Sequence, residues 1–125
     1  MITIHYCLHR KPDMSREAFS AYWRGDHAKL VSSLADCLGI ARYVQNHGAI
    51  PDIAAQMQAM RGTAEPFDGV AAISFNSVED LARGNTDPAA AEAQTLLTAD
   101  EAKFIDLPRS VILFTVANEV IACSV

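Results

Sequence analysis

Apolar and polar residues alternate from residue 2 to residue 9, the pattern of a strand with one strongly apolar face. The apolar face consists of Ile2, Ile4, Tyr6 and Leu8. Pro12 and Asp13 are turn-forming residues and end this first strand. The chain therefore begins with a predicted strand whose apolar face will be covered by other side chains of the protein.

A helical period follows, with apolar residues every three or four positions over roughly twenty residues. Ser15 is placed to cap this helix, Glu17 lies in its favourable first turn, and Gly39 ends the segment. The face with this period consists of Phe19, Tyr22, Trp23, Asp26, His27, Leu30, Val31 and Leu34. This is the best-defined element that the sequence predicts.

Two further strands are expected at residues 40–47 and 69–75, separated by a short helix that Pro51 opens and Gly62 closes. A helix from Ser77 to Gly84 comes next. These boundaries rest on cap residues and breakers as much as on hydrophobic period.

A last helix begins at Asp87-Pro88 and runs through an alanine-rich stretch. Thr98 and Glu101 fit a capping box, which predicts that the helix restarts there and continues to Ile105. Residues 109–121 are apolar on both faces, as expected of a central strand between two packed layers.

The predicted order is β-α-β-(α)-β-α-β within a single domain, residues 1–125. Two βαβ units of this kind form a four-stranded antiparallel sheet with helices on one face, an α+β fold. The uncovered face would be an aggregation hazard unless it packs on another sheet, so the topology predicts a homodimer.

Composition narrows the class of protein. Ten basic and fifteen acidic residues give a net charge of −5, and no basic cluster suits a nucleic-acid backbone. Three widely spaced cysteines without a signal peptide predict reduced thiols. The longest apolar run, residues 111–117, is far shorter than the about 20 residues that a membrane helix needs. We therefore expect a cytoplasmic, soluble protein without nucleic-acid or membrane partners.

His27 is the first candidate for chemistry because it lies in the middle of the apolar helix face, one turn from Trp23. A buried imidazole must be hydrogen-bonded, and it is the side chain best suited to proton transfer near neutral pH. Either it is a core histidine bonded to a backbone carbonyl, or it is a catalytic acid or base. The side chain of Trp23 either packs in the core or forms the wall of a pocket.

His47 and Tyr43 share a face of the second strand with Gln45, which would place a second proton-handling group opposite the His27 helix. The alternative is a strand-end histidine in solvent. Asp68 is a turn residue or orients a histidine.

Other candidates concern apolar contacts and metals. Tyr6 and three phenylalanines would line the core or an apolar pocket, namely Phe75, Phe104 and Phe114. His5, Cys7 and His9 are good metal donors, but on one flat strand they point in parallel and lack a fourth ligand, so no metal site is expected. No phosphate loop, GxGxxG, GxSxG or HExxH motif is present, which argues against nucleotide cofactors and serine hydrolysis.

The stretch from His9 to Val31 combines a Lys-Pro turn, a Ser-capped helix, Tyr22-Trp23 and a histidine four residues after the tryptophan. The stretch from Glu101 to Ile121 adds a Phe-x-Asp motif before the last strand. Together these motifs resemble the EthD family over effectively the whole chain. The resemblance implies a ferredoxin-like monomer and a dimeric α+β barrel.

Relatives with this fold include muconolactone isomerases and aromatic polyketide cyclases or dehydratases. The resemblance thus implies cofactor-independent acid–base chemistry on an apolar cyclic or aromatic molecule: isomerisation, dehydration or cyclisation. His27 occupies the family's motif position and would be the acid or base, assisted by His47 or Tyr43. Ala71 and Ala72 stand where some related isomerases carry a cysteine, which argues against thiol-assisted isomerisation.

Two alternative functions would use the same apolar pocket. One is a non-catalytic accessory or carrier protein that serves an oxidoreductase in ether or aromatic degradation, which needs no titrating histidine. The other is a cofactor-free monooxygenase, which the fold permits but no residue demands.

Overall fold

Four strands form a single antiparallel sheet in the structure, a computed structural model that describes residues 1–124. The strand order across the sheet is β2-β3-β1-β4. The strands are β1 (Ile2–Leu8), β2 (Arg42–His47), β3 (Gly69–Phe75) and β4 (Val111–Thr115). This arrangement confirms the α+β class with a ferredoxin-like sheet.

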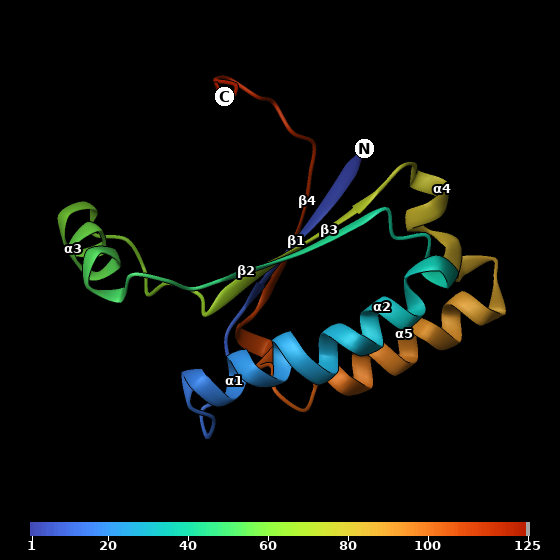
Figure 1. Cartoon of the computed structure of the whole chain (residues 1–125), viewed down its shortest axis with the longest axis horizontal. Coiled ribbons are helices and arrows are strands. Elements are labelled where there is room, and N and C mark those ends of the chain that lie inside the picture. The colour runs from blue at the N-terminus through green and yellow to red at the C-terminus, as the bar shows by residue number, and fades with distance from the viewer. Residues whose placement is uncertain (125) are drawn as a thin grey trace.

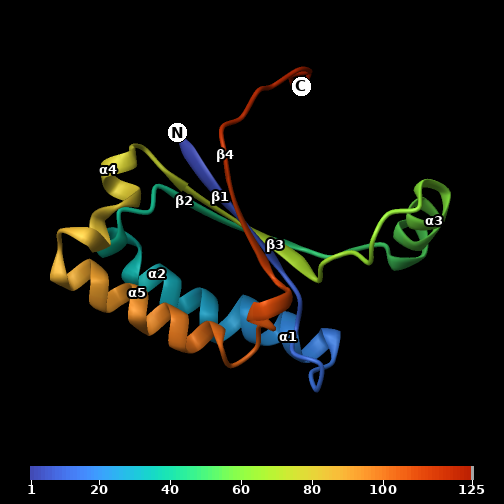
Figure 2. The same cartoon turned by 180° about the vertical axis from the view of Figure 1, so that it is seen from behind.

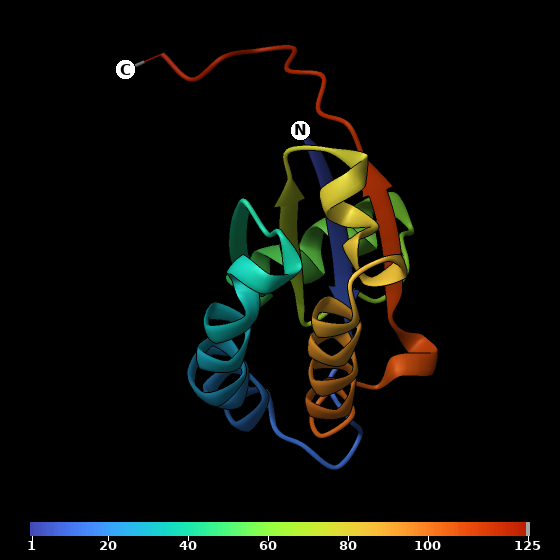
Figure 3. The same ribbon diagram turned by 90° about the vertical axis from the view of Figure 1, so that its right-hand side faces the viewer.

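The main helices cover one face of this sheet (Figures 1 and 3). On that face are α1 (Arg16–Tyr22), α2 (Ala28–Leu38) and α5 (Pro88–Glu101), with the short α4 (Val78–Leu81) at one end. By contrast, α3 (Pro51–Arg61) and the segment after β4 extend away from the body, as the reverse view also shows (Figure 2). No helix within residues 1–124 is long and apolar enough to cross a membrane.

The predicted caps hold the helices in place. Ser15 accepts a hydrogen bond from the backbone N–H of Ala18, and Asp87 accepts one from that of Ala89. Gly39 ends α2 with a φ of 74°, the left-handed conformation that glycine adopts without penalty. The sequence signals for the starts of α1 and α5 and for the end of α2 are therefore confirmed.

The first helix contains a feature that the period did not predict. Between α1 and α2 the chain makes a π-helical turn, Trp23–His27, so that the helix is continuous but locally widened. Such turns are rare and are frequently found at functional sites. The turn carries both Trp23 and His27, and it therefore changes the direction in which each side chain leaves the helix.

The core lies between the helices and the sheet. Its buried cluster consists of Leu8, Phe19, Trp23, Ala71, Phe104 and Ile105. The indole of Trp23 packs directly on β3 at Gly69, where an added Cβ would lie 2.5 Å from a ring carbon. Only glycine leaves room for the tryptophan there, which fixes the π-helical turn against the sheet.

Two predictions at the C-terminal end are wrong. The last strand was expected to be central over residues 109–121, but β4 spans only Val111–Thr115 and pairs with β1 alone. Its four apolar residues are about half exposed, because no second layer covers this edge. The predicted restart at Thr98 is also wrong: α5 is continuous from Pro88 to Glu101, and the Thr98 hydroxyl donates to the carbonyl of Gln94.

Candidate active site

His27 and Asp100 form a buried pair between the π-helical turn and the end of α5. Nδ1 of His27 lies 2.7 Å from Oδ2 of Asp100, and the two residues are 5% and 8% exposed. The imidazole also packs 4.9 Å from the ring of Phe104. The sequence suggested a backbone carbonyl as the structural partner of this histidine, whereas the structure supplies a carboxylate.

The environment of Asp100 decides which atom of the pair carries the proton. Burial alone would raise the pKa of Asp100, but hydrogen bonds from Tyr22 and His27 outweigh it and lower the pKa below the ordinary value. The Tyr22 hydroxyl donates to Oδ1 over 2.6 Å, and Nζ of Lys103 lies 3.4 Å from the same oxygen. Asp100 is therefore an ionised acceptor at neutral pH.

An ionised carboxylate can only accept, so Nδ1 of His27 is the N–H donor of the pair. In the neutral ring the lone pair then lies on Nε2. The hydrogen bonds of residues 1–124 use Nδ1 and leave Nε2 free. None of the buried side-chain nitrogens and oxygens in this part of the chain lacks a partner, so Nε2 is not sealed from solvent.

Glu101, the next residue of α5, has the opposite electrostatic setting. Burial raises the pKa of Glu101, the hydrogen bond from Tyr6 opposes this, and the charge of Asp100 raises it further. The Tyr6 hydroxyl donates to Oε1 over 3.1 Å. Two adjacent carboxyl groups thus have pKa values shifted in opposite directions, an arrangement typical of acid–base sites.

Tyr22, Tyr6 and Tyr43 all have pKa values above that of an exposed tyrosine. Hydrogen bonding to Asp100, with burial, raises the pKa of Tyr22 to about 12. Burial and the charge of Glu101 raise the pKa of Tyr6 far above its ordinary value. Burial likewise raises the pKa of Tyr43, although hydrogen bonds oppose it. The hydroxyls of Tyr22 and Tyr6 position the two carboxylates, and all three tyrosines stay protonated.

His47 lies on the strand face predicted for it and is linked to the first helix. Its Nδ1 is 2.8 Å from the Ser20 hydroxyl, its Nε2 is 2.9 Å from Oε1 of Gln45, and its ring packs 4.4 Å from Trp23. Gln45 also donates to the Tyr43 hydroxyl and to the carbonyl of Trp23 in the π-helical turn. The structure therefore brings His47 and Tyr43 into one network, separate from that of His27.

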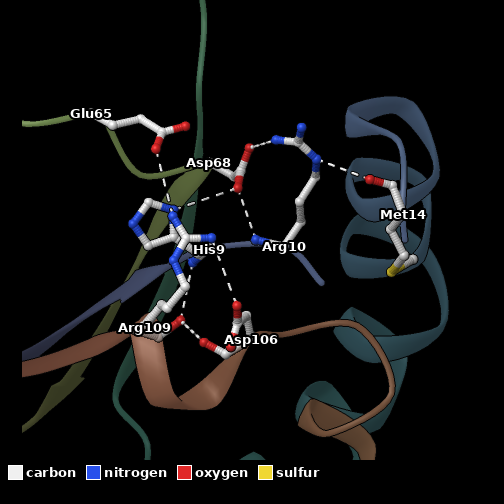
Figure 4. A network of polar contacts seen from close by, with 8 residues as sticks. His9, Arg10, Met14, Glu65, Asp68, Asp106 and Arg109 are labelled. Atoms are coloured by element: carbon white, nitrogen blue, oxygen red, sulfur yellow. Dashed lines mark hydrogen bonds and ion pairs between the residues drawn. The ribbon is translucent and has the colours of Figure 1, made fainter. Parts of the chain in front are cut away.

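Asp68 is held in a different network, at the start of β3 (Figure 4). Its carboxylate accepts from the backbone N–H of Arg10 over 2.8 Å and pairs with the guanidinium of the same residue. Nδ1 of His9 lies 3.9 Å away. The side chain of Asp68 thus contacts Arg10 and His9 and orients neither His27 nor His47, and it holds the end of β1 to the loop before β3.

The aromatic candidates are placed unequally. Phe104 is fully buried beside His27, and Phe75 is buried at the far end of β3. Phe114 is 58% exposed on β4 and belongs to no buried cluster. Within residues 1–124 no group of three metal-binding side chains comes together.

The sequence analysis did not identify Asp100 and Glu101 as site residues, and it did not identify Tyr22 as a partner of Asp100. A signal for Asp100 was present, since Ala90, Ala93, Leu97 and Asp100 recur at spacings of three and four. Ala90 and Ala93 are buried on α5, so an acid on the same stripe must also face inward. A charged residue in a buried stripe needs a partner, and that partner is His27.

Known proteins resemble this chain in sequence. The chain is 32% identical over 104 residues to the "Conidial pigment biosynthesis dehydratase EthD" of Metarhizium robertsii, covering 81% of this chain and 71% of the relative. It is 25% identical over 113 residues to "Dehydratase aurZ" of Gibberella zeae, covering 88% and 72%.

Solved structures share the fold at low identity. An EthD family protein from Bacillus halodurans superposes with a TM-score of 0.60 at 13% identity, covering 94% of this chain and all of that chain. A dimeric protein of unknown function with a ferredoxin-like fold, from Bacteroides fragilis, gives 0.57 at 10% identity, with 91% and 93% covered. The EthD domain model itself matches residues 11–108. The chain therefore belongs to the EthD domain family.

Proposed function

We propose that this protein is a cofactor-independent dehydratase that removes water from a β-hydroxy carbonyl compound with an apolar, polyketide-like or aromatic body. One observation carries the proposal: Asp100 holds Nδ1 of His27 over 2.7 Å and leaves Nε2 without a partner. The two relatives with dehydratase in their names support this reaction class.

His27 is the proposed general base. A carboxylate on Nδ1 fixes the tautomer and stabilises the imidazolium that forms when Nε2 takes a proton. The Tyr22 hydroxyl donates to the other oxygen of Asp100 and the Lys103 ammonium lies near it, which keeps the carboxylate in one orientation. The rigid end of α5 supports this arrangement.

Glu101 is the proposed general acid. Its raised pKa keeps more of the carboxylic acid form near neutral pH than an exposed glutamate would have. Tyr6 orients the group through its hydrogen bond to Oε1. The proposed base and acid would thus both depend on the end of α5, where Asp100 holds His27 and Glu101 is the next residue.

In the proposed reaction, Nε2 of His27 takes the proton from the carbon next to the carbonyl group. The electron pair forms the carbon–carbon double bond, and the β-hydroxyl group leaves with the proton of Glu101 as water. The products are an α,β-unsaturated carbonyl compound and water. The proton on His27 then returns to Glu101 through solvent.

The enzyme is proposed to act as a homodimer. Val111, Ile112, Leu113 and Phe114 of β4 are 48–58% exposed, and the sheet face opposite the helices is bare in Figures 1 and 2. A neighbour with this fold is described as dimeric. A second copy would remove these apolar side chains from water.

The test uses a simple β-hydroxy ketone, the aldol of benzaldehyde and acetone, whose dehydration to benzylideneacetone is followed by absorbance. We expect turnover by the wild-type protein and a loss of at least about 100-fold in kcat/KM for His27→Gln, the usual contribution of a general base. Glu92→Gln, an exposed change on α5, is the matched control. A folded His27→Gln protein with full turnover would overturn the proposal.

The same experiment separates an enzyme from a carrier. Trp23 is the single tryptophan and is buried one turn from His27, so its fluorescence reports ligand binding. Binding of the ketone with no rate above buffer, unchanged in His27→Gln, would favour an accessory protein. Binding together with His27-dependent turnover supports the dehydratase.

A further inference from the structure

A second group of chemically active side chains lies outside the His27 pair, where α1 meets the end of β2. Ser20, His47 and Gln45 form a continuous chain of hydrogen bonds, with 2.8 Å from the Ser20 hydroxyl to Nδ1 and 2.9 Å from Nε2 to Oε1 of Gln45. A hydroxyl, an imidazole and an orienting acceptor in this order are the parts of an activated serine.

The partners of Gln45 determine the direction of these bonds. Its Nε2 donates to the Trp23 carbonyl over 2.8 Å and to the Tyr43 hydroxyl over 3.1 Å. Its Oε1 is therefore the acceptor, and Nε2 of His47 must carry the proton that it accepts. In the neutral ring Nδ1 then has the lone pair, and the Ser20 hydroxyl donates to it.

The surroundings keep that ring neutral. Burial lowers the pKa of His47, and the charge of Arg24 lowers it further. Ser20 has another possible acceptor in its own helix, since serines within helices often bond the carbonyl four residues back. Here its hydroxyl lies within hydrogen-bonding distance of His47, which is a distant residue in the sequence.

Ser20 and His47 both line a pocket with a volume of about 530 Å³ between α1, α3 and the loop before β3. A pocket of this size suits a small organic molecule. Phe19, Ala54, Ala55, Pro66 and Phe67 contribute apolar surface. The polar lining consists of Arg16, Gln58, Glu17, Glu65 and the Arg10–Asp68 ion pair. His27 and Asp100 do not line this pocket, so it is distinct from the proposed dehydration site.

We infer that this pocket is an acyl-transfer site, with Ser20 as nucleophile, His47 as general base and Gln45 as positioning residue, for esters or thioesters of small apolar acids. Oγ of Ser20 forms a bond to the carbonyl carbon while its proton passes to Nδ1 of His47. That proton then leaves with the alcohol or thiol. Water attacks the acyl-serine in the same way, releases the acid and restores the Ser20 hydroxyl.

The inference goes beyond the proposed dehydratase because it uses a different pocket and different residues. It also differs from the expectation that a chain without a GxSxG motif carries no serine hydrolysis. Such a motif describes one strand–turn–helix setting for a serine, whereas here a helix and a strand bring the two residues together.

The test is covalent labelling with diisopropyl fluorophosphate, which reacts with activated serines by loss of fluoride. We expect one added diisopropylphosphoryl group, located on Ser20 by peptide mass spectrometry, and a burst of p-nitrophenol from p-nitrophenyl butyrate. Ser20→Ala should abolish the adduct, and His47→Ala should slow labelling at least about 100-fold. Ser32→Ala, an exposed serine on α2, should label as the wild type does.

Gln45 gives the sharper test of positioning. Gln45→Leu should slow labelling without moving the adduct, and Gln45→Glu, whose carboxylate still accepts from Nε2 of His47, should restore the rate. An unchanged wild-type mass under conditions that label a known serine hydrolase, or an adduct on another residue, would overturn the inference. The peptide map of the labelled wild-type protein tests the inference without any variant, so the test stands even if a variant fails to fold. Neither result depends on His27, so failure here leaves the proposed dehydration untouched.

Discussion

Asp100 Oδ2 lies 2.7 Å from His27 Nδ1, although the two residues are 73 positions apart in the chain. The contact joins the π-helical turn of the first helix to the last turn of α5. A buried carboxylate and a buried imidazole are each costly alone, and each supplies the partner that the other needs. The contact therefore stabilises the fold, and the proposed chemistry would depend on the same contact.

Replacing Asp100 by asparagine should separate these two effects. The amide keeps the shape but loses the charge that selects the Nδ1–H tautomer of His27. We expect Asp100→Asn to lower kcat/KM on the β-hydroxy ketone by about 100-fold or more. Asp106→Asn, which removes a charge paired with Arg109 at a distant site, should change it little. Equal losses in both variants would contradict a specific role for Asp100.

Glu101 predicts how stability changes with pH. A carboxyl group whose pKa is higher in the folded state than its ordinary 4.5 destabilises the fold as pH rises through that folded-state value. Asp100 has the opposite sign, since its pKa is lowered, and its contribution is lost only as pH falls below about 3.8. Between pH 4.5 and 8, Glu101→Gln should therefore gain stability relative to the wild type as pH rises.

Thermal unfolding across this pH range measures the difference. The exposed Glu92→Gln variant, on the same helix, should follow the wild-type curve at every pH. Parallel curves for Glu101→Gln and the wild type would mean that burial does not affect the ionisation of Glu101.

The contact between Gly69 and Trp23 predicts how far one added methyl group lowers the free energy of unfolding. A Cβ on Gly69 would lie 2.5 Å and 2.8 Å from two ring carbons of Trp23 and 2.9 Å from the carbonyl oxygen of Asn46. Gly69→Ala should lower the free energy of unfolding by about 1–3 kcal/mol, as overpacking of a core does. Gly25→Ala has nothing within 4 Å and should be neutral or stabilising. Urea unfolding of both variants tests this.

The exposed edge predicts assembly. Sedimentation should give twice the chain mass of 13.5 kDa for the wild type. Leu113 pairs with His5 on β1 and is 56% exposed, so Leu113→Glu would place a charge in the proposed interface and should shift the protein to monomer. The same sedimentation measurement on Met60→Glu, a change at an exposed position of α3, tests whether α3 takes part in the dimer. A wild-type monomer at all concentrations would refute the proposed dimer.

Much of the fold was predictable because local signals agreed with one another. The first helix was found from its period and from Ser15 and Gly39, both of which act as caps in the structure. The strand at 69–75 was predicted with the bounds of β3. The order of elements then left few ways to arrange the sheet.

The rest depends on contacts between distant segments. Apolar residues on both faces of residues 109–121 predicted a central strand, but sequence pattern alone cannot show whether another layer of the same chain covers them. The link from His27 to Asp100, likewise, required the relative placement of two helices. The π-helical turn has no cap or breaker that marks it, since Gly25 alone is compatible with an ordinary helix.

Long-range ¹H–¹⁵N NMR of the wild-type protein at neutral pH shows directly which nitrogen of the His27 ring carries the proton. We expect a proton on Nδ1, bonded to Asp100, and an unprotonated Nε2 whose resonance shifts when the β-hydroxy ketone is added. A ring with its proton on Nε2, or with an Nε2 resonance that the ketone does not affect, would contradict it.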